Sequence, residues 1–224
     1  KDAILAINEN VDWLALSFVR SKSDIEDLLK IINQNSKYRI PVIAKIEKPE
    51  ALKNIDEIIK VSSGLMVARG DLGVELQSSE IPLIQKKLVA KAKKARIPVI
   101  IATQMMESMM DSMSPSRAEV NDVANSVMDG ADAVMLSGET SVGKYPLEVI
   151  KTISSIINKV ENSNLISLAN KRPKDQKSKR YITKSICFSA AKMANDIKAK
   201  AISTLYNSSF KSFQISSCSY HLYT

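Results

Sequence analysis

The stretch VIAKIEKPE, residues 42–50, decides how the rest of the sequence is interpreted. Val42, Ile43 and Ala44 are typical of a buried β-strand. Lys45 and Glu47 then interrupt the apolar run with one residue between them. Because side chains alternate between the two faces of a strand, both charges point to the same side. We therefore expect the end of this otherwise apolar strand to face a polar site.

Four further apolar runs resemble this one along the first 140 residues. Each is rich in β-branched or aliphatic residues and lacks a clean polar–apolar alternation, which is typical of strands covered on both faces. The five runs are WLALSFV (13–19), IPVIAKIE (40–47), GLMVARGD (64–71), IPVIIATQ (97–104) and ADAVMLSGE (131–139).

Helical patterns separate and follow these runs. Ser23 is expected to cap the first helix, Pro49 begins the second, and Ser116 with Glu119 forms a capping box before the fourth. The apolar stripes are Ile25, Leu28, Leu29 and Ile32; Leu52, Ile55, Ile58 and Ile59; Ile81, Ile84, Leu88 and Ala92; Val120, Val123, Ala124 and Val127; and, from Pro146, Leu147, Ile150, Ile153, Ile157 and Val160.

This alternation predicts parallel strands with crossover helices, in an open doubly wound sheet or in a barrel. Polar residues stand at the carboxyl end of every run: Ser17, Lys45, Glu47, Arg69, Asp71, Thr103, Gln104, Ser137 and Glu139. A barrel directs all its strand ends at one site, whereas an open sheet concentrates function at one switch point. We therefore predict an α/β fold, a partial (β/α)8 TIM barrel of about five βα units, with Lys45 and Glu47 at the mouth of its site.

The bulk composition is that of a soluble globular protein. Of the 224 residues, 45% are hydrophobic and 25% charged, and no run of 18 apolar residues predicts a membrane span. Cys187 and Cys218 belong to no CxxC or Cys/His cluster, which favours a reducing cytoplasm over a disulfide scaffold or a zinc site. The one histidine, His221, stands almost at the carboxyl terminus, so catalysis by a histidine base has almost no candidate.

The excess of positive charge is confined to about the last quarter of the chain. Residues 1–161 hold 21 basic and 22 acidic side chains, whereas residues 162–224 hold 11 basic and 2 acidic ones. The densest run is KRPKDQKSKR (171–180), with a proline and no aromatic residue. Such a run favours a solvated linker over a nucleic-acid surface.

Glu47 and Asp71 are expected at the tips of adjacent strands, which lie ~4.8 Å apart. Two carboxylates at that spacing suit Mg²⁺, which takes one or two of them together with substrate oxygens and water. The alternative is that Glu47 only pairs with Lys45 or Lys48. Lys45 would neutralise phosphate charge or, if deprotonated, form a Schiff base; a neighbouring metal-binding carboxylate favours phosphate, and the alternative is that Lys45 only balances Glu47.

Three other segments bear on the site. In MVARGDLG, Gly70 and Gly73 would let a tight turn bring N–H groups close to an anion. Thr103 offers a hydroxyl on the next strand. SGETSVGKYP (137–146) lacks the spacing of a P-loop, and the methionines of TQMMESMMDSM (103–113) favour adaptable packing over a cofactor site.

The sequence resembles the pyruvate kinases of bacterial type. The resemblance is carried by IAKIE, VARGDLG, IIATQMMESM, SPSRAEVNDVANSVMDGADAVMLSGET and GKYPLEVI, in that order along the chain. It runs from about Ala3 to Glu161, and more weakly to about Phe213. Ser116 stands where the family usually has threonine, a change that keeps the helix cap.

This resemblance implies phosphoryl transfer from phosphoenolpyruvate to ADP, giving pyruvate and ATP. Lys45 would stabilise the phosphoryl group and the enolate, and Glu47 and Asp71 would hold Mg²⁺ or Mn²⁺. Gly70, Asp71 and Thr103 would contact substrate, with Thr103 near the carbon that takes the proton. It also implies K⁺, whose ligands lie outside this chain, a cytoplasmic homo-oligomer (a homotetramer in the family) with Arg117 near a subunit contact, and no nucleic-acid or membrane partner.

The family barrel has eight strands, and five are predicted here. We expect residues 1–161 to be the second part of the barrel, 162–180 a basic linker, and 181–224 the truncated start of an α/β C-terminal domain. The missing strands, much of the nucleotide pocket and a lid would precede Lys1. The chain is therefore expected to be a fragment that lacks activity alone.

Two other functions remain open from the residues. One is a metal- or Schiff-base-dependent aldolase or lyase of pyruvate chemistry that uses Lys45. The other is a non-catalytic module that binds nucleic acid or a membrane surface through its basic tail.

Overall fold

Five parallel strands form the centre of the fold. The computed structural model describes residues 1–163, 181–199 and 202–203. Its strands are β1 (Leu14–Leu16), β2 (Val42–Ile46), β3 (Gly64–Ala68), β4 (Val99–Ala102) and β5 (Ala133–Met135), each inside the run that predicted it. They pair in the order β1-β2-β3-β4-β5. An order without reversal is that of a barrel and not of a doubly wound sheet, so the predicted partial barrel is confirmed.

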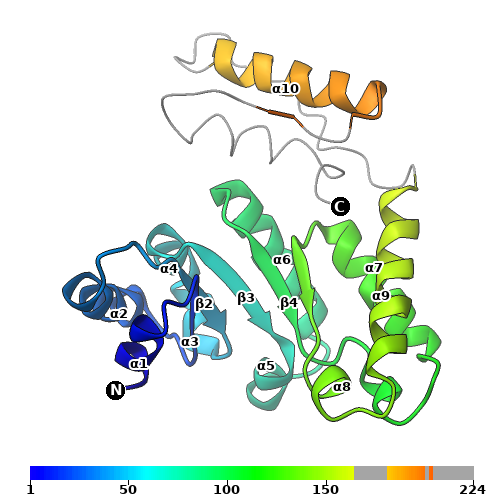
Figure 1. Cartoon of the computed structure of the whole chain (residues 1–224), viewed down its shortest axis with the longest axis horizontal. Helices are drawn as coiled ribbons and strands as arrows, with labels where there is room; N and C mark the ends of the chain where they lie inside the picture. The colour runs from blue at the N-terminus through cyan, green and yellow to red at the C-terminus, as the bar shows by residue number, and fades with distance from the viewer. Residues whose placement is uncertain (164–180, 200–201, 204–224) are drawn as a thin grey trace. The chain divides into compact units, whose positions relative to one another are not determined.

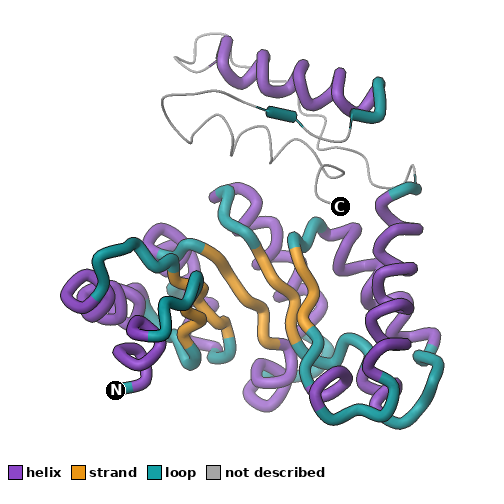
Figure 2. The backbone as a smooth tube through the Cα atoms, viewed as in Figure 1, coloured by secondary structure: helices purple, strands orange, loops and turns teal. Residues whose placement is uncertain are grey.

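A layer of helices covers the sheet (Figure 2). The longer helices that follow the strands are α2 (Lys22–Asn35), α4 (Ile55–Val61), α6 (Ile81–Ala95), α7 (Arg117–Asp129) and α9 (Pro146–Glu161). Along this layer α2 contacts α4, α4 contacts α6, and α6 contacts α7. Shorter elements are α1 (Asp2–Asn8), α3 (Pro49–Lys53), α5 (Arg69–Glu75), the 3₁₀ helix η1 (Glu107–Met110) and α8 (Gly138–Ser141).

The strand register separates the two faces of the sheet. Lys45 pairs with Met66, and Met66 pairs with Ile100. These three side chains therefore lie on one face of the sheet, the face of the predicted site. The opposite face packs under the helices. Its buried core residues on the strands are Val42, Ala44, Ile46, Leu65, Val67, Val99 and Ile101.

The strand ends meet at one end of the sheet. α3 follows β2, α5 follows β3 and α8 follows β5, and these short helices lie together at the lower end of the sheet in Figure 1. The residues expected to carry the chemistry therefore emerge on the same side.

The prediction for residues 64–71 was wrong at its end. The strand stops at Ala68, and Arg69–Glu75 form α5, with Asp71 in the first turn and Leu72 buried. A carboxylate in the first turn suits the positive end of the helix dipole. Neither Gly70 nor Gly73 has a positive φ, so the tight glycine turn expected there is a helix instead.

Two helices differ from the prediction at or near their start. Ser21, and not Ser23, caps α2, because the Asp24 carboxylate accepts the N–H groups of Arg20 and Ser21. The helix predicted from Pro49 is broken at Asn54 into α3 and α4. The Ser116–Glu119 capping box is present as predicted.

The chain divides into two compact units, Lys1–Ile157 and Asn158–Thr224. The second contains α10 (Tyr181–Asp196). Most of the predicted linker, the basic run 171–180, Cys218 and His221 lie outside the described residues. Among the residues that are described, no helix has the length and apolar character needed to cross a membrane.

Candidate active site

Lys45 and Glu47 form an ion pair at the end of β2. Lys45 Nζ lies 2.6 Å from Glu47 Oε1, and the Glu47 side chain is only 2% exposed against 25% for Lys45. Glu47 Oε2 accepts the Phe18 N–H at 2.6 Å, and Lys45 Nζ donates to Ser17 Oγ at 3.0 Å. A buried carboxylate is tolerated when it is paired in this way. Each carboxylate oxygen still has a second lone pair, so the ion pair does not use up Glu47 as a ligand.

The loop after β1 is shaped by the same carboxylate. Phe18 has a φ of 56°, an unusual value for an aromatic residue. Its N–H is held by Glu47, and the Lys48 ammonium lies 5.7 Å from the centre of its ring. The ends of β1 and β2 are therefore tied together by both Lys45 and Glu47.

Asp71 is exposed in the first turn of α5. This helix is joined to the segment after β2 by an ion pair of 2.5 Å between Glu75 and Lys48. Residues four apart share a helix face, so Asp71 and Glu75 lie on one side of α5. An exposed carboxylate on that side and the buried one of Glu47 are the hard oxygen ligands that Mg²⁺ prefers.

The described residues do not form a closed metal cage. Within residues 1–163 and the described part of 181–203, no three or more His, Cys, Asp or Glu side chains are grouped to hold a metal. Mg²⁺ keeps several waters and takes only one or two carboxylates. Glu47 and Asp71 fit that donor number, and the outer positions would fall to water or substrate.

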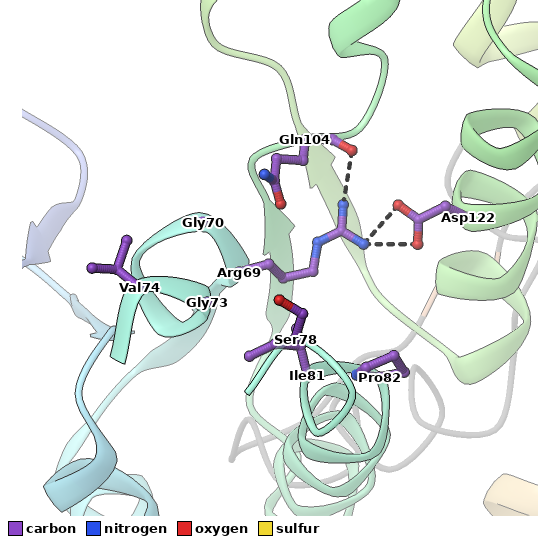
Figure 3. A pocket seen from close by; sticks show the side chains of 9 residues that line it. All are labelled: Arg69, Gly70, Gly73, Val74, Ser78, Ile81, Pro82, Gln104 and Asp122. Carbon is purple, nitrogen blue, oxygen red and sulfur yellow. Dashed lines mark hydrogen bonds and ion pairs between the residues drawn. The ribbon is translucent and has the colours of Figure 1, made fainter. Parts of the chain in front are cut away.

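Arg69 connects β3 to three other elements. Its side chain is 8% exposed, and its Nη1 lies 2.7 Å from both carboxylate oxygens of Asp122 in α7. Its Nη2 donates to the carbonyl oxygen of Thr103 at 2.7 Å. It also donates to the carbonyl oxygen of Gln104 at 3.2 Å (Figure 3). Gln85 of α6 also accepts from Nη1, at 3.4 Å. The guanidinium thus links the ends of β3 and β4 with α6 and α7.

Thr103 and Gln104 adopt a strained conformation after β4. Their φ angles are 70° and 56°, in the left-handed region. For residues other than glycine this costs ~1–3 kcal/mol each, most clearly for a β-branched threonine. Thr103 Oγ1 accepts the Gly70 N–H at 2.8 Å and donates to the Ala102 carbonyl at 2.6 Å. A Cβ on Gly70 would lie 3.2 Å from Thr103 Oγ1, so this close approach favours glycine.

Glu139 lies in α8, just after β5, and makes the last contacts of this series. It is 3% exposed, and its oxygens accept the N–H groups of Ser137 at 2.7 Å and Met106 at 3.4 Å. Hydrogen bonds or ion pairs therefore join each strand end to the next, from β1 to β5.

One cavity lies beside this network. It has a volume of about 410 Å³ and is lined by Arg69, Gly70, Gly73, Val74, Ser78, Ile81, Pro82, Gln104 and Asp122 (Figure 3). Neither Lys45 nor Glu47 lines it. The cavity therefore belongs to the Arg69 side of α5 and not to the lysine–carboxylate pair.

Sequence reasoning missed Asp122, Gln85 and Phe18. A buried arginine needs a carboxylate, and this requirement was the available signal for a partner of Arg69. It does not identify Asp122, which stands 53 residues away among many other acids. The strained turn at Thr103 and the bent loop at Phe18 leave no mark in the sequence pattern.

Comparison with known proteins agrees with this architecture. The family model "Pyruvate kinase, barrel domain" matches residues 1–150. A pyruvate kinase of Mycobacterium tuberculosis is 52% identical over 164 residues, which are 73% of this chain and 34% of that protein. Pyruvate kinase 2 of a Synechocystis species is 43% identical over 205 residues, 92% of this chain and 34% of that protein.

A Corynebacterium glutamicum pyruvate kinase is 46% identical over 202 residues, 90% of this chain and 41% of that protein. The chain thus spans between a third and about two fifths of the length of these relatives. The parallel strand order, the matched barrel domain and the extent of identity together show that the chain belongs to the pyruvate kinase family.

Proposed function

We propose that this chain carries part of the active site of a pyruvate kinase, which transfers the phosphoryl group of phosphoenolpyruvate to ADP and gives pyruvate and ATP. The observation that carries this proposal is the Lys45–Glu47 ion pair of 2.6 Å at the end of β2, with the Asp71 carboxylate on the adjoining helix. Phosphoryl transfer depends mainly on positioning and on neutralising charge, and these residues supply both signs.

Lys45 would stabilise the transferring phosphoryl group and the enolate. Its ammonium is held between Ser17 Oγ and Glu47 Oε1, so it is fixed before substrate arrives. A fixed charge acts without reorganisation during the reaction. Because Lys45 already forms an ion pair, its geometry favours phosphate chemistry over the Schiff base of an aldolase or lyase.

Glu47 and Asp71 would hold Mg²⁺ or Mn²⁺. When bound, such an ion neutralises the charge on phosphate and enolate oxygens. Glu47 is oriented for this role by Lys45 and by the Phe18 N–H, whereas Asp71 is exposed and accessible from solvent.

Gly70, Asp71 and Thr103 would contact substrate. The Thr103 hydroxyl would stand near the methylene carbon that becomes the methyl group of pyruvate. Thr103 Oγ1 accepts the Gly70 N–H, so the backbone sets the position of this oxygen relative to the first turn of α5. A positioned hydroxyl of this kind fits a role in proton transfer.

We also propose, from the family, a requirement for K⁺, an ATP/ADP partner site outside this chain, and a cytoplasmic homotetramer. Arg117, expected near a subunit contact, is exposed at the first residue of α7, which leaves it accessible to another subunit. The two cysteines in no motif are compatible with a reducing compartment.

Calorimetric titration of phosphoenolpyruvate into the chain, with and without Mg²⁺, tests the proposed function. We expect binding that requires Mg²⁺. Asp71→Asn should weaken Mg²⁺ binding itself, whereas Lys45→Met should leave Mg²⁺ bound and abolish phosphoryl transfer in a complete enzyme. Borohydride trapping of pyruvate on Lys45, with no metal-dependent binding, would instead identify an aldolase or lyase.

A further inference from the structure

We propose that Arg69 is a positioning residue that holds the Thr103–Gln104 turn and thereby aims the Thr103 hydroxyl. The proposal rests on the proposed function only in assigning Thr103 a contact with substrate. The hydrogen bonds from the Arg69 guanidinium to the turn are present in the structure and do not depend on that function.

The guanidinium selects the left-handed turn. Its Nη2 donates to two successive carbonyl groups, those of Thr103 and Gln104. Successive carbonyls of a strand point in opposite directions, whereas those of a helical or left-handed helical turn point the same way. With φ angles of 70° and 56°, the turn presents both oxygens to one donor, and an extended chain would not.

Residues 69 and 70 hold Thr103 at two points. The Arg69 side chain takes the Thr103 carbonyl at 2.7 Å, and the Gly70 N–H donates to the Thr103 hydroxyl at 2.8 Å. These two donors come from neighbouring residues at the start of α5. The backbone and the side chain of Thr103 are therefore placed relative to the same turn of helix, and the same helix carries Asp71.

The geometry specifically requires arginine. Asp122 engages Nη1 while Nη2 serves the carbonyls, and Nε is buried with no partner. The hydrogen bonds to Asp122 and to the turn are therefore all made by Nη1 and Nη2. A lysine ammonium is a single point and does not span Asp122 and two carbonyls in the same way.

Two substitutions separate positioning from general stability. Arg69→Met removes the donors and keeps an unbranched apolar stem, whereas Gln85→Met disturbs the same buried cluster without touching the turn. Gln85 is 5% exposed and contacts Ser126 and Arg69 at 3.4 Å each. Arg69→Lys retains a charge for Asp122 and serves if the methionine variant does not fold.

The first measurement is amide hydrogen exchange in the 224-residue chain, compared at equal global stability set by urea. We expect Arg69→Met, and also Arg69→Lys, to speed exchange of the Gly70 amide about tenfold over Gln85→Met. The Val42–Ile46 strand should be unaffected. Equal exchange in the Arg69 and Gln85 variants would overturn the proposal.

The second measurement, made in a complete enzyme that contains this sequence, follows proton transfer as Mg²⁺-dependent exchange of the pyruvate methyl hydrogens with solvent. We expect Arg69→Met to lower its maximal rate about 100-fold while the concentration of pyruvate at half-maximal rate changes less than about threefold. An unchanged maximal rate would show a purely structural arginine. If the unsubstituted complete enzyme shows neither this exchange nor phosphoenolpyruvate binding, the proposed function fails. Exchange of the Gly70 amide in the 224-residue chain then still decides whether Arg69 holds the turn.

Discussion

Thr103 combines a strained backbone with a hydroxyl that has both a donor and an acceptor partner. Thr103→Val keeps the branched shape but leaves the Gly70 N–H without its acceptor, so we expect a loss of ~1–3 kcal/mol in the free energy of unfolding. Thr103→Ser keeps the hydroxyl and should cost less than ~1 kcal/mol. Urea unfolding of both variants measures the difference. Equal losses would mean that the hydroxyl bonds contribute nothing to the turn.

The Lys45–Glu47 pair is asymmetric, because one partner is nearly inaccessible and the other is not. Lys45→Met leaves a carboxylate at 2% exposure without its cation. We expect a loss of ~1–3 kcal/mol in the free energy of unfolding, the usual cost of leaving a buried polar group without its partner. Glu47→Gln leaves an ammonium that water can reach, and its amide oxygen can still accept the Phe18 N–H, so it should cost less.

A double-mutant cycle tests this asymmetry. The variant with both substitutions should be more stable than Lys45→Met alone, because no buried charge remains. Additive losses in urea unfolding would show that the two side chains do not interact energetically. The geometry of the ion pair predicts the sign of this coupling energy.

Short elements at the strand ends depend on two glycines in opposite ways. A Cβ on Gly143 would lie 2.5 Å from the Glu139 carbonyl oxygen, so Gly143→Ala must displace α8 and should cost about 1–3 kcal/mol. A Cβ on Gly73 meets nothing within 4 Å, and Gly73→Ala inside α5 should stabilise by ~0.5–1 kcal/mol. Thermal unfolding of both variants checks the opposite signs, and a stabilising Gly143→Ala would contradict the close approach of Gly143 to α8.

The first turn of α7 should respond to acid. Burial alone would raise the pKa of Glu119, but hydrogen bonds from Ser108 and Ser116 outweigh it and hold the pKa below the ordinary value of 4.5. A carboxyl whose pKa is lower in the folded state stabilises the fold above its unfolded pKa and loses this effect as the pH falls through the folded value.

We therefore expect Glu119→Gln to be destabilising near neutral pH, with a difference from the unsubstituted chain that shrinks on acidification. Urea unfolding across the acid range measures it. Glu57→Gln, on the exposed face of α4, is the matched control. A difference that stays constant from neutral to strongly acid pH would contradict the assigned cause.

The elements were largely predictable because each has a local cause. The five apolar runs and the Ser116–Glu119 box specify their strands and helix by composition and spacing alone. The errors occurred where local patterns compete. Ser21 and Ser23 are both good caps, and only the contact of Asp24 with residues 20 and 21 selects the first. Residues 69–75 carry two glycines yet form a helix after Ala68, since Leu72 is buried from there.

The site was predictable only in part. Lys45 and Glu47 are two residues apart on one strand, so their shared face follows from the period of the strand. The partners of Arg69 come from residues 34, 35 and 53 positions away, and no local pattern contains them. Positive φ angles at Phe18, Thr103 and Gln104 are likewise imposed by tertiary contacts, against the preference of these residue types.

At the scale of the sheet, the contacts at the strand ends follow the strand order. Ser17 meets Lys45, the Gly70 N–H meets Thr103, and Met106 meets Glu139. Parallel strands in chain order bring residues from each unit next to those of the following unit. A site assembled in this way is divided among all five units, and its geometry depends on the whole sheet.

The same sheet has two edges among the described residues, β1 and β5. Each presents a row of backbone groups without a neighbouring strand there, which favours pairing with another chain. We expect self-association that rises with protein concentration, measured by sedimentation velocity. Ala15→Lys with Ala133→Lys adds charge at exposed positions on both edges and should shift the chain toward monomer. Ala95→Lys, at the exposed end of α6, adds the same kind of charge away from the edges. If Ala95→Lys reduced association as strongly as the edge substitutions, charge repulsion and not strand pairing would govern it.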